Sequence, residues 1–264
     1  MAVVAKQTPA DLWTTFSDAY VVVRTWIGGL DNAALRRPSV LAGWTVGDLA
    51  VHTSRSASSM SNLGLAEPGQ HPLAVAEYIA TYAEHSAGIA ERARVSVGGP
   101  DRTVDDVVAA MTDGLAAASD AVAGWSGDPV ISGSFGPIRG SDFLLTRILE
   151  LVIHADDLAR SVPDITAPAL PRPAIRSAVR TLLNVLAERY PGRSVEVRVP
   201  PFAAVQAIEG PRHTRGTPSN VLETGPTTWL RLAAGRIGWA EARQSGELSA
   251  SGQRADLSAV LPLL

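Results

Sequence analysis

Hydrophobic residues recur at helical spacing through the first 160 positions, and recognisable start signals divide them into separate helices. Threonine followed three residues later by aspartate, the pattern of a capping box, occurs at Thr8–Asp11, Thr45–Asp48 and Thr103–Asp106. Ser141 is a further N-cap candidate. Together with the intervening breaks, these signals predict a bundle of helices over residues 9–28, 46–63, 73–95, 104–124 and 142–161, with a loop or small hairpin at 128–140.

The pattern changes after a run of prolines between positions 163 and 173, where a continuous helix is excluded. The alternating residues Val195, Val197 and Val199 predict a strand. The elements expected around it are helices over 174–190, 227–235 and 238–246, a hairpin partner at 202–208, a short strand at 247–251 and a closing helix at 255–264. We therefore expect an α+β protein with two domains, residues 1–165 and 166–264.

Composition narrows the class of protein. The 264 residues are 46% hydrophobic and 19% charged, enough to bury a core, and the net charge of −3 offers no basic surface for nucleic acid. No apolar run approaches the roughly 18 residues of a membrane span, and the first residues lack the apolar core of a signal peptide. We expect a cytoplasmic protein with no nucleic-acid partner and no membrane span.

The chain contains no cysteine, which excludes disulfides, thiolate metal sites and a cysteine nucleophile. The G-x-S-x-G, G-x-G-x-x-G and P-loop patterns are also absent. Metal chemistry would therefore depend on His, Asp and Glu. Two of the five histidines have an acid one helical turn before them within a predicted helix: Asp48/His52 and Glu150/His154.

The positions of these pairs suggest a shared site. His52 lies about seven residues after the start of its helix, and His154 about seven residues before the end of its own. If the two helices pack antiparallel, both imidazoles lie roughly 10 Å from the same end of the bundle, with Glu150 one turn deeper. Two histidines and one carboxylate would leave a coordination position open, as in catalytic metal sites.

Blander interpretations stay open at this point. In the first alternative, Glu150 and His154 form only a local ion pair on their helix. In the same alternative, His52 is a half-buried histidine of the core and binds no metal. Asp48 has two interpretations as well: it orients His52, or it only completes the capping box of its helix.

Two segments resemble the metal-binding domain of mycothiol-dependent maleylpyruvate isomerases, which belongs to the DinB-like helical bundles: GWTVGDLAVHTSR (43–55) and LLTRILELVIHADDLAR (144–160). In that family a His of the first segment and the Glu and His of the second bind a divalent metal, typically zinc. The resemblance implies that the ligands here are His52, Glu150 and His154.

The end of the chain, residues 213–264, resembles the bacterial sterol-carrier-like domain that often follows this bundle. In the isomerases a C-terminal domain contributes an arginine to the substrate. Arg212, Arg215 and Arg231 are candidates for that role, and His213 lies in the same polar loop. Each of these residues is also compatible with an ordinary surface position.

Two functions follow from the resemblance. The first is a metal-dependent isomerase or S-transferase that uses mycothiol, a low-molecular-weight thiol, to attack a small electrophilic substrate. The second is a sterol-carrier-like protein that binds a lipid or another apolar ligand and whose metal site is vestigial or structural. Trp229, Leu230 and Leu232 would line its cavity, although their spacing is more typical of a core. A protein-interaction module in which neither site is active is a third, weaker option.

Overall fold

The computed structural model describes residues 7–81, 101–210 and 220–264, and its fold is α+β, as the sequence predicts. Contacts divide the chain into two compact units, Met1–Ala174 and Ile175–Leu264. Residues 162–171, between the last helix of the bundle and the next helix, contain no helix or strand. The proposed domain boundary after residue 165 lies in this segment.

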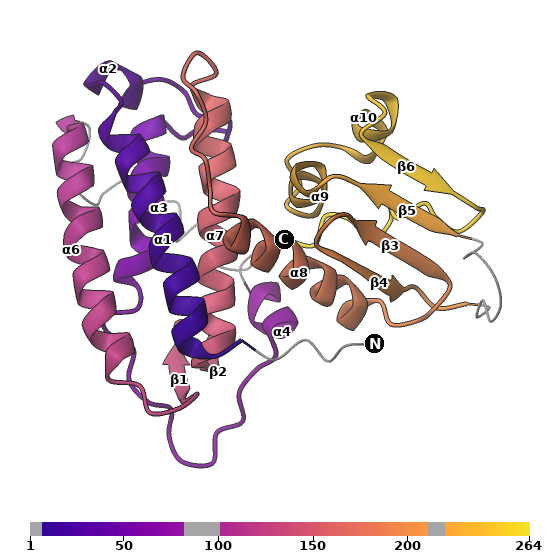
Figure 1. The fold of residues 1–264 in the computed structure, drawn as a ribbon, viewed down its shortest axis with the longest axis horizontal. Coiled ribbons are helices and arrows are strands. Elements are labelled where there is room, and N and C mark those ends of the chain that lie inside the picture. The colour runs from indigo at the N-terminus through magenta and orange to yellow at the C-terminus, as the bar shows by residue number, and fades with distance from the viewer. Residues whose placement is uncertain (1–6, 82–100, 211–219) are drawn as a thin grey trace. The chain divides into compact units, whose positions relative to one another are not determined.

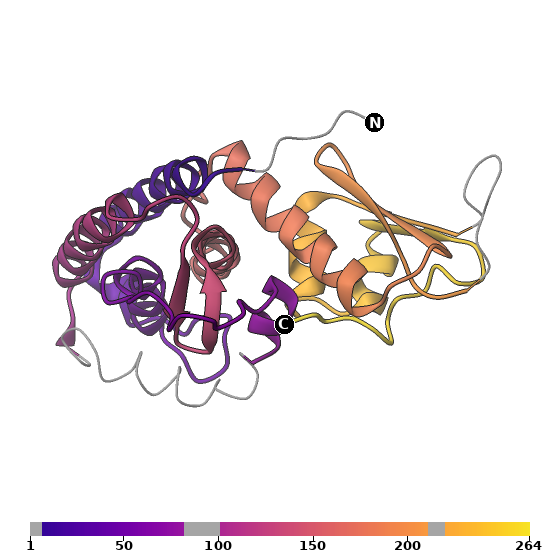
Figure 2. The same ribbon diagram turned by 90° about the horizontal axis from the view of Figure 1, so that it is seen from below.

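Four long helices form the bundle of the first unit: α1 (Pro9–Gly28), α3 (Val46–Ser58), α6 (Val104–Ala123) and α7 (Gly140–Ser161). Both α1 and α3 pack against α6 and α7, so the four surround one core (Figures 1 and 2). The shorter α2 (Asn32–Leu35) and α4 (Val75–Ala80) connect them. The rest of the helix expected over 73–95 lies outside the described residues.

The three capping boxes form as predicted. Thr8, Thr45 and Thr103 each accept a hydrogen bond from the backbone N–H three residues on, and each aspartate accepts one in return. The apolar face of α1 that follows its cap is fully buried, including Phe16 and Tyr20. One boundary differs, because α3 ends at Ser58 and not near position 63.

The start of α7 corrects the expectation that Ser141 caps this helix. The helix begins at Gly140, and Ser141 donates from both its N–H and its Oγ to the carboxylate of Asp128, each at 2.8 Å. Asp128 precedes the hairpin of β1 (Val130–Gly133) and β2 (Gly136–Arg139) that leads into α7. A Cβ at position 140 would lie 2.7 Å from the ring of Trp125, so the close approach requires glycine there.

The second unit is built on a four-stranded sheet with the order β4-β3-β5-β6. Its elements are α8 (Arg172–Arg189), β3 (Val195–Val199), β4 (Ala203–Ala207), β5 (Val221–Thr224), α9 (Pro226–Ala233), α10 (Trp239–Gln244) and β6 (Leu248–Ser251). Strand β3 pairs antiparallel with β4 and parallel with β5, and β6 pairs antiparallel with β5. Helix α9 packs on α8, where Trp229 Nε1 donates to the carbonyl of Val179 at 3.4 Å.

Two expectations for this unit were wrong. No strand was expected over residues 221–224, where β5 lies, and this four-residue strand depends on its pairing with β3 and β6. Residues 255–264 form no helix. Pro262 cannot continue a helical hydrogen-bond ladder, and the N–H groups of Leu263 and Leu264 donate instead to the carbonyl of Ala233.

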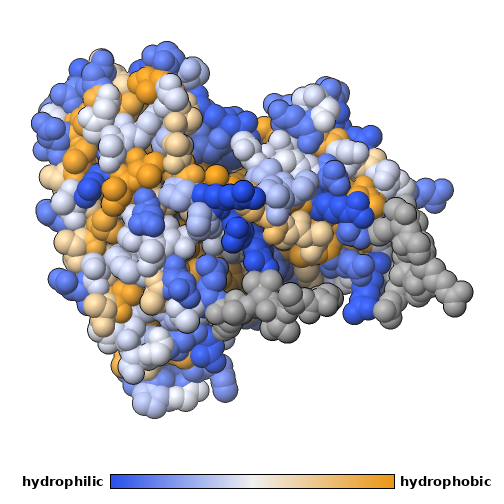
Figure 3. Space-filling model, viewed as in Figure 1, coloured by the Kyte–Doolittle hydropathy of each residue, from blue (hydrophilic) through white to orange (hydrophobic). Residues whose placement is uncertain are grey.

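Polar and hydrophobic residues are interspersed on the face of the bundle shown in Figure 3. The large hydrophobic side chains with the greatest exposure among the described residues are Val21, Val40, Leu65 and Leu264. Within the described ranges, none of the helices combines the length and the apolar character that a membrane crossing needs.

Candidate metal centre

Three side chains from two neighbouring helices meet inside the bundle. His52 projects from the middle of α3, and Glu150 and His154 project from α7. The Nε2 of His52 lies 3.2 Å from the Nε2 of His154 and 3.3 Å from Oε1 of Glu150. Among the described residues, this is the group of His, Asp and Glu side chains whose ligand atoms are close enough to share one metal ion.

The course of the helices explains why residues 98 positions apart meet. In Figure 1, α3 starts near α2, at the end of the bundle where α7 finishes, so the two helices run antiparallel. The capping box at Thr45 fixes where α3 begins and therefore how far His52 lies from that end. Glu150 and His154 are one helical turn apart and share a face of α7. The convergence suggested by the sequence is present in the structure.

Two charged side chains of α7 hold two members of the triad. Arg147 Nη1 lies 2.6 Å from Oε2 of Glu150, and Asp157 Oδ2 lies 3.1 Å from Nδ1 of His154. Both partners are buried, Asp157 completely. Each supporting residue is three positions from the side chain it contacts, so α7 carries the two ligand candidates together with their supports.

Aromatic packing restrains the third member. The indole of Trp44 meets the imidazole of His52 edge to face, with ring centroids 5.4 Å apart and planes at 79°. The ring of His154 is also edge to face with that of His52, at 4.7 Å. These contacts limit rotation of the His52 ring and keep its Nε2 directed at the other two side chains.

The charges of the site suit metal binding. Burial lowers the pKa of His52 to about 4, with a smaller contribution from His154, so the imidazole is neutral at pH 7. Burial by itself would raise the pKa of Glu150, but Arg147 above all, with the two histidines, holds that pKa below its usual value. The site therefore presents an ionised carboxylate and a neutral His52 ring, and metal binding requires ligands in these forms.

The donor set and its spacing fit a tetrahedral divalent cation such as zinc. Two nitrogens bound to one zinc ion at about 2.0–2.1 Å lie about 3.3 Å apart when the angle between them is tetrahedral. The separations of 3.2 and 3.3 Å around His52 Nε2 match that edge length. Two histidines and one carboxylate also leave a position open for a further ligand.

Asp48 has partners other than the triad. Its Oδ2 accepts from the N–H and the Oγ1 of Thr45, at 2.9 and 2.8 Å. Its Oδ1 lies 3.1 Å from Nη1 of Arg102. These contacts complete the capping box and pair the acid with an arginine, while the suggested role of Asp48 in orienting His52 stays a prediction.

The substrate candidates of the C-terminal half are only partly described. Arg212, His213 and Arg215 lie outside the described residues, and their roles stay predictions. Arg231 lies in the last turn of α9. The suggested cavity residues Trp229, Leu230 and Leu232 are all buried in the second unit.

The sequence reasoning missed Arg147 and Asp157. The signal was present, because an arginine three residues before Glu150 and an aspartate three residues after His154 share their face of one helix. Charged residues at such spacing are also common on solvated faces, and what distinguishes these two is burial, which the helical pattern alone did not reveal.

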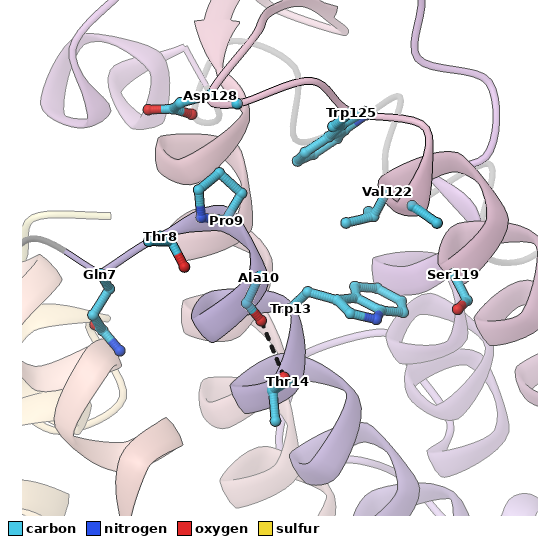
Figure 4. A pocket seen from close by; sticks show the side chains of 12 residues that line it. Gln7, Thr8, Pro9, Ala10, Trp13, Thr14, Ser119, Val122, Trp125 and Asp128 are labelled. Carbon is cyan, nitrogen blue, oxygen red and sulfur yellow. Dashed lines mark hydrogen bonds between the residues drawn. The ribbon is translucent and has the colours of Figure 1, made fainter.

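A second concave region is less suited to chemistry. An open groove of about 740 Å³ lies between the start of α1 and the end of α6, where Trp13, Val122 and Trp125 line it (Figure 4). Its one charged lining residue, Asp128, is engaged by Ser141. The groove adjoins the beginning of α7, and His154 lies fourteen residues further along, about 20 Å away.

Comparisons with known proteins give a family match for each part of the chain. Residues 16–159 match the family model of the mycothiol maleylpyruvate isomerase N-terminal domain, and residues 171–263 match the family described as bacterial SCP ortholog. Two solved structures, of the mycothiol-dependent maleylpyruvate isomerase and of its histidine-to-alanine mutant, each align with 92% of this chain and 92% of their own at a TM-score of 0.59. Their identity of 17% limits that similarity to the fold. No curated protein sequence matches the chain.

Proposed function

Because the chain belongs to the mycothiol maleylpyruvate isomerase family by its N-terminal domain, we propose that it is a metal-dependent enzyme that uses mycothiol. The proposed reaction is the isomerisation of a small electrophile, or the transfer of the thiol to it. The proposed metal is zinc, the proposed ligands are His52, Glu150 and His154, and the proposed location is the cytoplasm.

The observation that carries this proposal is the meeting of three metal-donor atoms inside the bundle, with His52 Nε2 3.2 and 3.3 Å from the other two. A structural role alone does not require this arrangement. Two imidazole nitrogens that face each other beside a carboxylate are poorly satisfied by hydrogen bonds, because at most one proton fits between the nitrogens. A shared cation satisfies all three atoms at once.

The residues of the chain divide the work of the site between them. Glu150 contributes the negative charge and Arg147 keeps its carboxylate in place and ionised. The neutral ring of His52 contributes a lone pair, and Trp44 restrains the orientation of that ring. A divalent cation held by His52, Glu150 and His154 would supply the remaining chemistry, since it would lower the pKa of a thiol bound to it and so provide a thiolate near neutral pH.

The absence of cysteine means that the thiol required by the proposed reaction is not part of the chain. The chain has no sulfur nucleophile of its own, so the thiolate has to come from a small molecule. A thiolate adds readily to an activated alkene and leaves a carbanion with a single bond in place of the double bond. Rotation about that bond and departure of the thiolate give an isomer, whereas protonation of the carbanion gives a thioether. The proposed partners are therefore mycothiol and a small electrophile.

The match of residues 171–263 to the bacterial SCP ortholog family favours one alternative, a non-enzymatic carrier of a lipid or another apolar ligand. In that case the bundle metal is structural or vestigial. Trp229 and Leu232 count against a large cavity around α9, because both side chains are buried within the second unit.

Metal analysis of the purified protein tests the proposal. We expect about one zinc ion per chain in the wild type and in His71→Ala, which alters an exposed histidine of a loop, and a large loss of metal in His52→Ala. The metal-loaded protein should also consume mycothiol in the presence of activated alkenes. A wild type that stays free of metal in metal-replete medium would rule the enzyme out, and binding of fatty-acid probes without thiol consumption would support the carrier.

A further inference from the structure

The fully buried side chain of Asp157 contacts the imidazole of His154. Asp157 has an exposed fraction of 0%, and its Oδ2 lies 3.1 Å from the Nδ1 of His154, whereas the other ring nitrogen of His154, Nε2, faces His52. Burying a carboxylate is costly unless it is hydrogen-bonded. The hydrogen bond with His154 therefore stabilises the buried carboxylate and also gives the imidazole Nδ1 a partner.

The contact has a consequence for the proton of the imidazole. A carboxylate only accepts hydrogen bonds, so the partner nitrogen, Nδ1, is the one that carries hydrogen. In a neutral ring the other nitrogen, Nε2, then has a free lone pair. That nitrogen is the atom that faces His52 at 3.2 Å.

We propose that Asp157 is a positioning residue of the metal centre, which fixes the tautomer and the orientation of His154 so that Nε2 presents its lone pair to the cation. The inference deepens the proposed function and rests on its metal site. It is specific to His154, since the contacts of the His52 ring among the described residues are with Trp44, Glu150 and His154.

The neighbouring acid provides a matched control. Asp156 precedes Asp157 on α7 and points in another direction, because successive helical side chains are separated by about 100°. It is partly exposed, unlike Asp157. Asp157→Asn and Asp156→Asn therefore remove the same charge from the same turn, and only the first alters the contact with His154.

Zinc affinity tests the proposal through binding and not through activity. In competition with a chromophoric chelator, Asp157→Asn should bind zinc about 10- to 100-fold more weakly than the wild type, as removal of such outer partners does elsewhere. Asp156→Asn should bind zinc as the wild type does. Equal affinities in all three full-length proteins would overturn the proposal.

The tautomer itself is a second readout, which a merely structural acid would not control. In the metal-free wild type, two-bond nitrogen–proton spectra, assigned with His154→Gln, should place the proton of His154 on Nδ1. A proton on Nε2 would contradict the inference. This measurement needs neither zinc nor a folded Asp157 variant, so it decides the matter even if Asp157→Asn does not fold. A wild type that binds no zinc would instead refute the proposed function.

Discussion

Arg147 shows how a single residue links stability to the candidate site. Its guanidinium lies 2.6 Å from Glu150 and 4.9 Å from the ring centre of Phe143, and its side chain is only 10% exposed. A buried ion pair contributes little net stability compared with apolar packing, but removing one partner leaves an uncompensated charge. The function of the ion pair is therefore best tested by removing first one of its two charges and then both.

We predict that Arg147→Met lowers the free energy of unfolding of the metal-free protein by about 3 kcal/mol, because Glu150 is then buried without a cation. Urea unfolding in the presence of a chelator measures this loss. Adding zinc should restore more stability to Arg147→Met than it adds to the wild type, since the metal supplies the missing positive charge.

A double variant is the control. Arg147→Met with Glu150→Gln removes both charges and should be more stable without metal than Arg147→Met alone. If the single and double variants unfold alike, the charge of Glu150 is not what makes the substitution harmful.

The meeting of the three triad residues could be predicted from the sequence, whereas the burial of their two supporting residues could not. The spacing of Glu150 and His154 and the cap at Thr45 place the three side chains at one level of the bundle, provided that the two helices pack antiparallel. Arg147 and Asp157 were overlooked because helical spacing shows which residues share a face and not how deeply that face is buried. The burial of Asp157 follows from packing by the rest of the unit.

At the scale of elements, local signals succeeded where the chain itself supplies the hydrogen bonds. The capping boxes fixed the starts of α1, α3 and α6 because Thr and Asp bond within their own turn. The prediction that Ser141 caps α7 was wrong because the side chain that accepts from the first turn belongs to Asp128, thirteen residues earlier in the chain. The same reason explains why strand β5 was missed and why a helix was wrongly predicted at residues 255–264. In both segments, hydrogen bonds with residues far away in the sequence determine the structure.

The caps also predict a pH dependence of stability. Hydrogen bonds from the N–H and the hydroxyl of Thr103 lower the pKa of Asp106 below its usual 3.8. Because the folded-state pKa is the lower one, the contribution of Asp106 is complete above about pH 4 and is lost as pH falls through the folded-state pKa.

Thermal unfolding of Asp106→Asn across pH tests this expectation. The wild type should be the more stable protein at pH 7, and the difference should shrink as the pH falls below about 4. Asp105→Asn, which alters the adjacent acid in the same first turn, is the matched control because it leaves both bonds between Thr103 and Asp106 in place. A difference that is independent of pH would show that the carboxylate is not the cap.

At the scale of the whole molecule, two units with different architectures follow each other in one chain, and the described parts of the candidate site all belong to the first. The ligand candidates and their supports lie between Trp44 and Asp157, within the segment that matches the isomerase N-terminal domain. The second unit matches a different family. What the sequence predicted for Arg212, His213 and Arg215 is therefore a prediction about the second unit that still needs its own test.

The absence of cysteine from the chain makes one spectroscopic experiment unusually direct. Cobalt in place of zinc absorbs strongly in the near ultraviolet when a thiolate is bound to it, and this protein has no thiolate to offer. The cobalt-loaded protein should therefore lack that band alone and gain it when mycothiol is added, and His52→Ala should not gain it. A cobalt-loaded wild type whose spectrum does not change with mycothiol would contradict the central claim that the triad holds a metal for thiol chemistry.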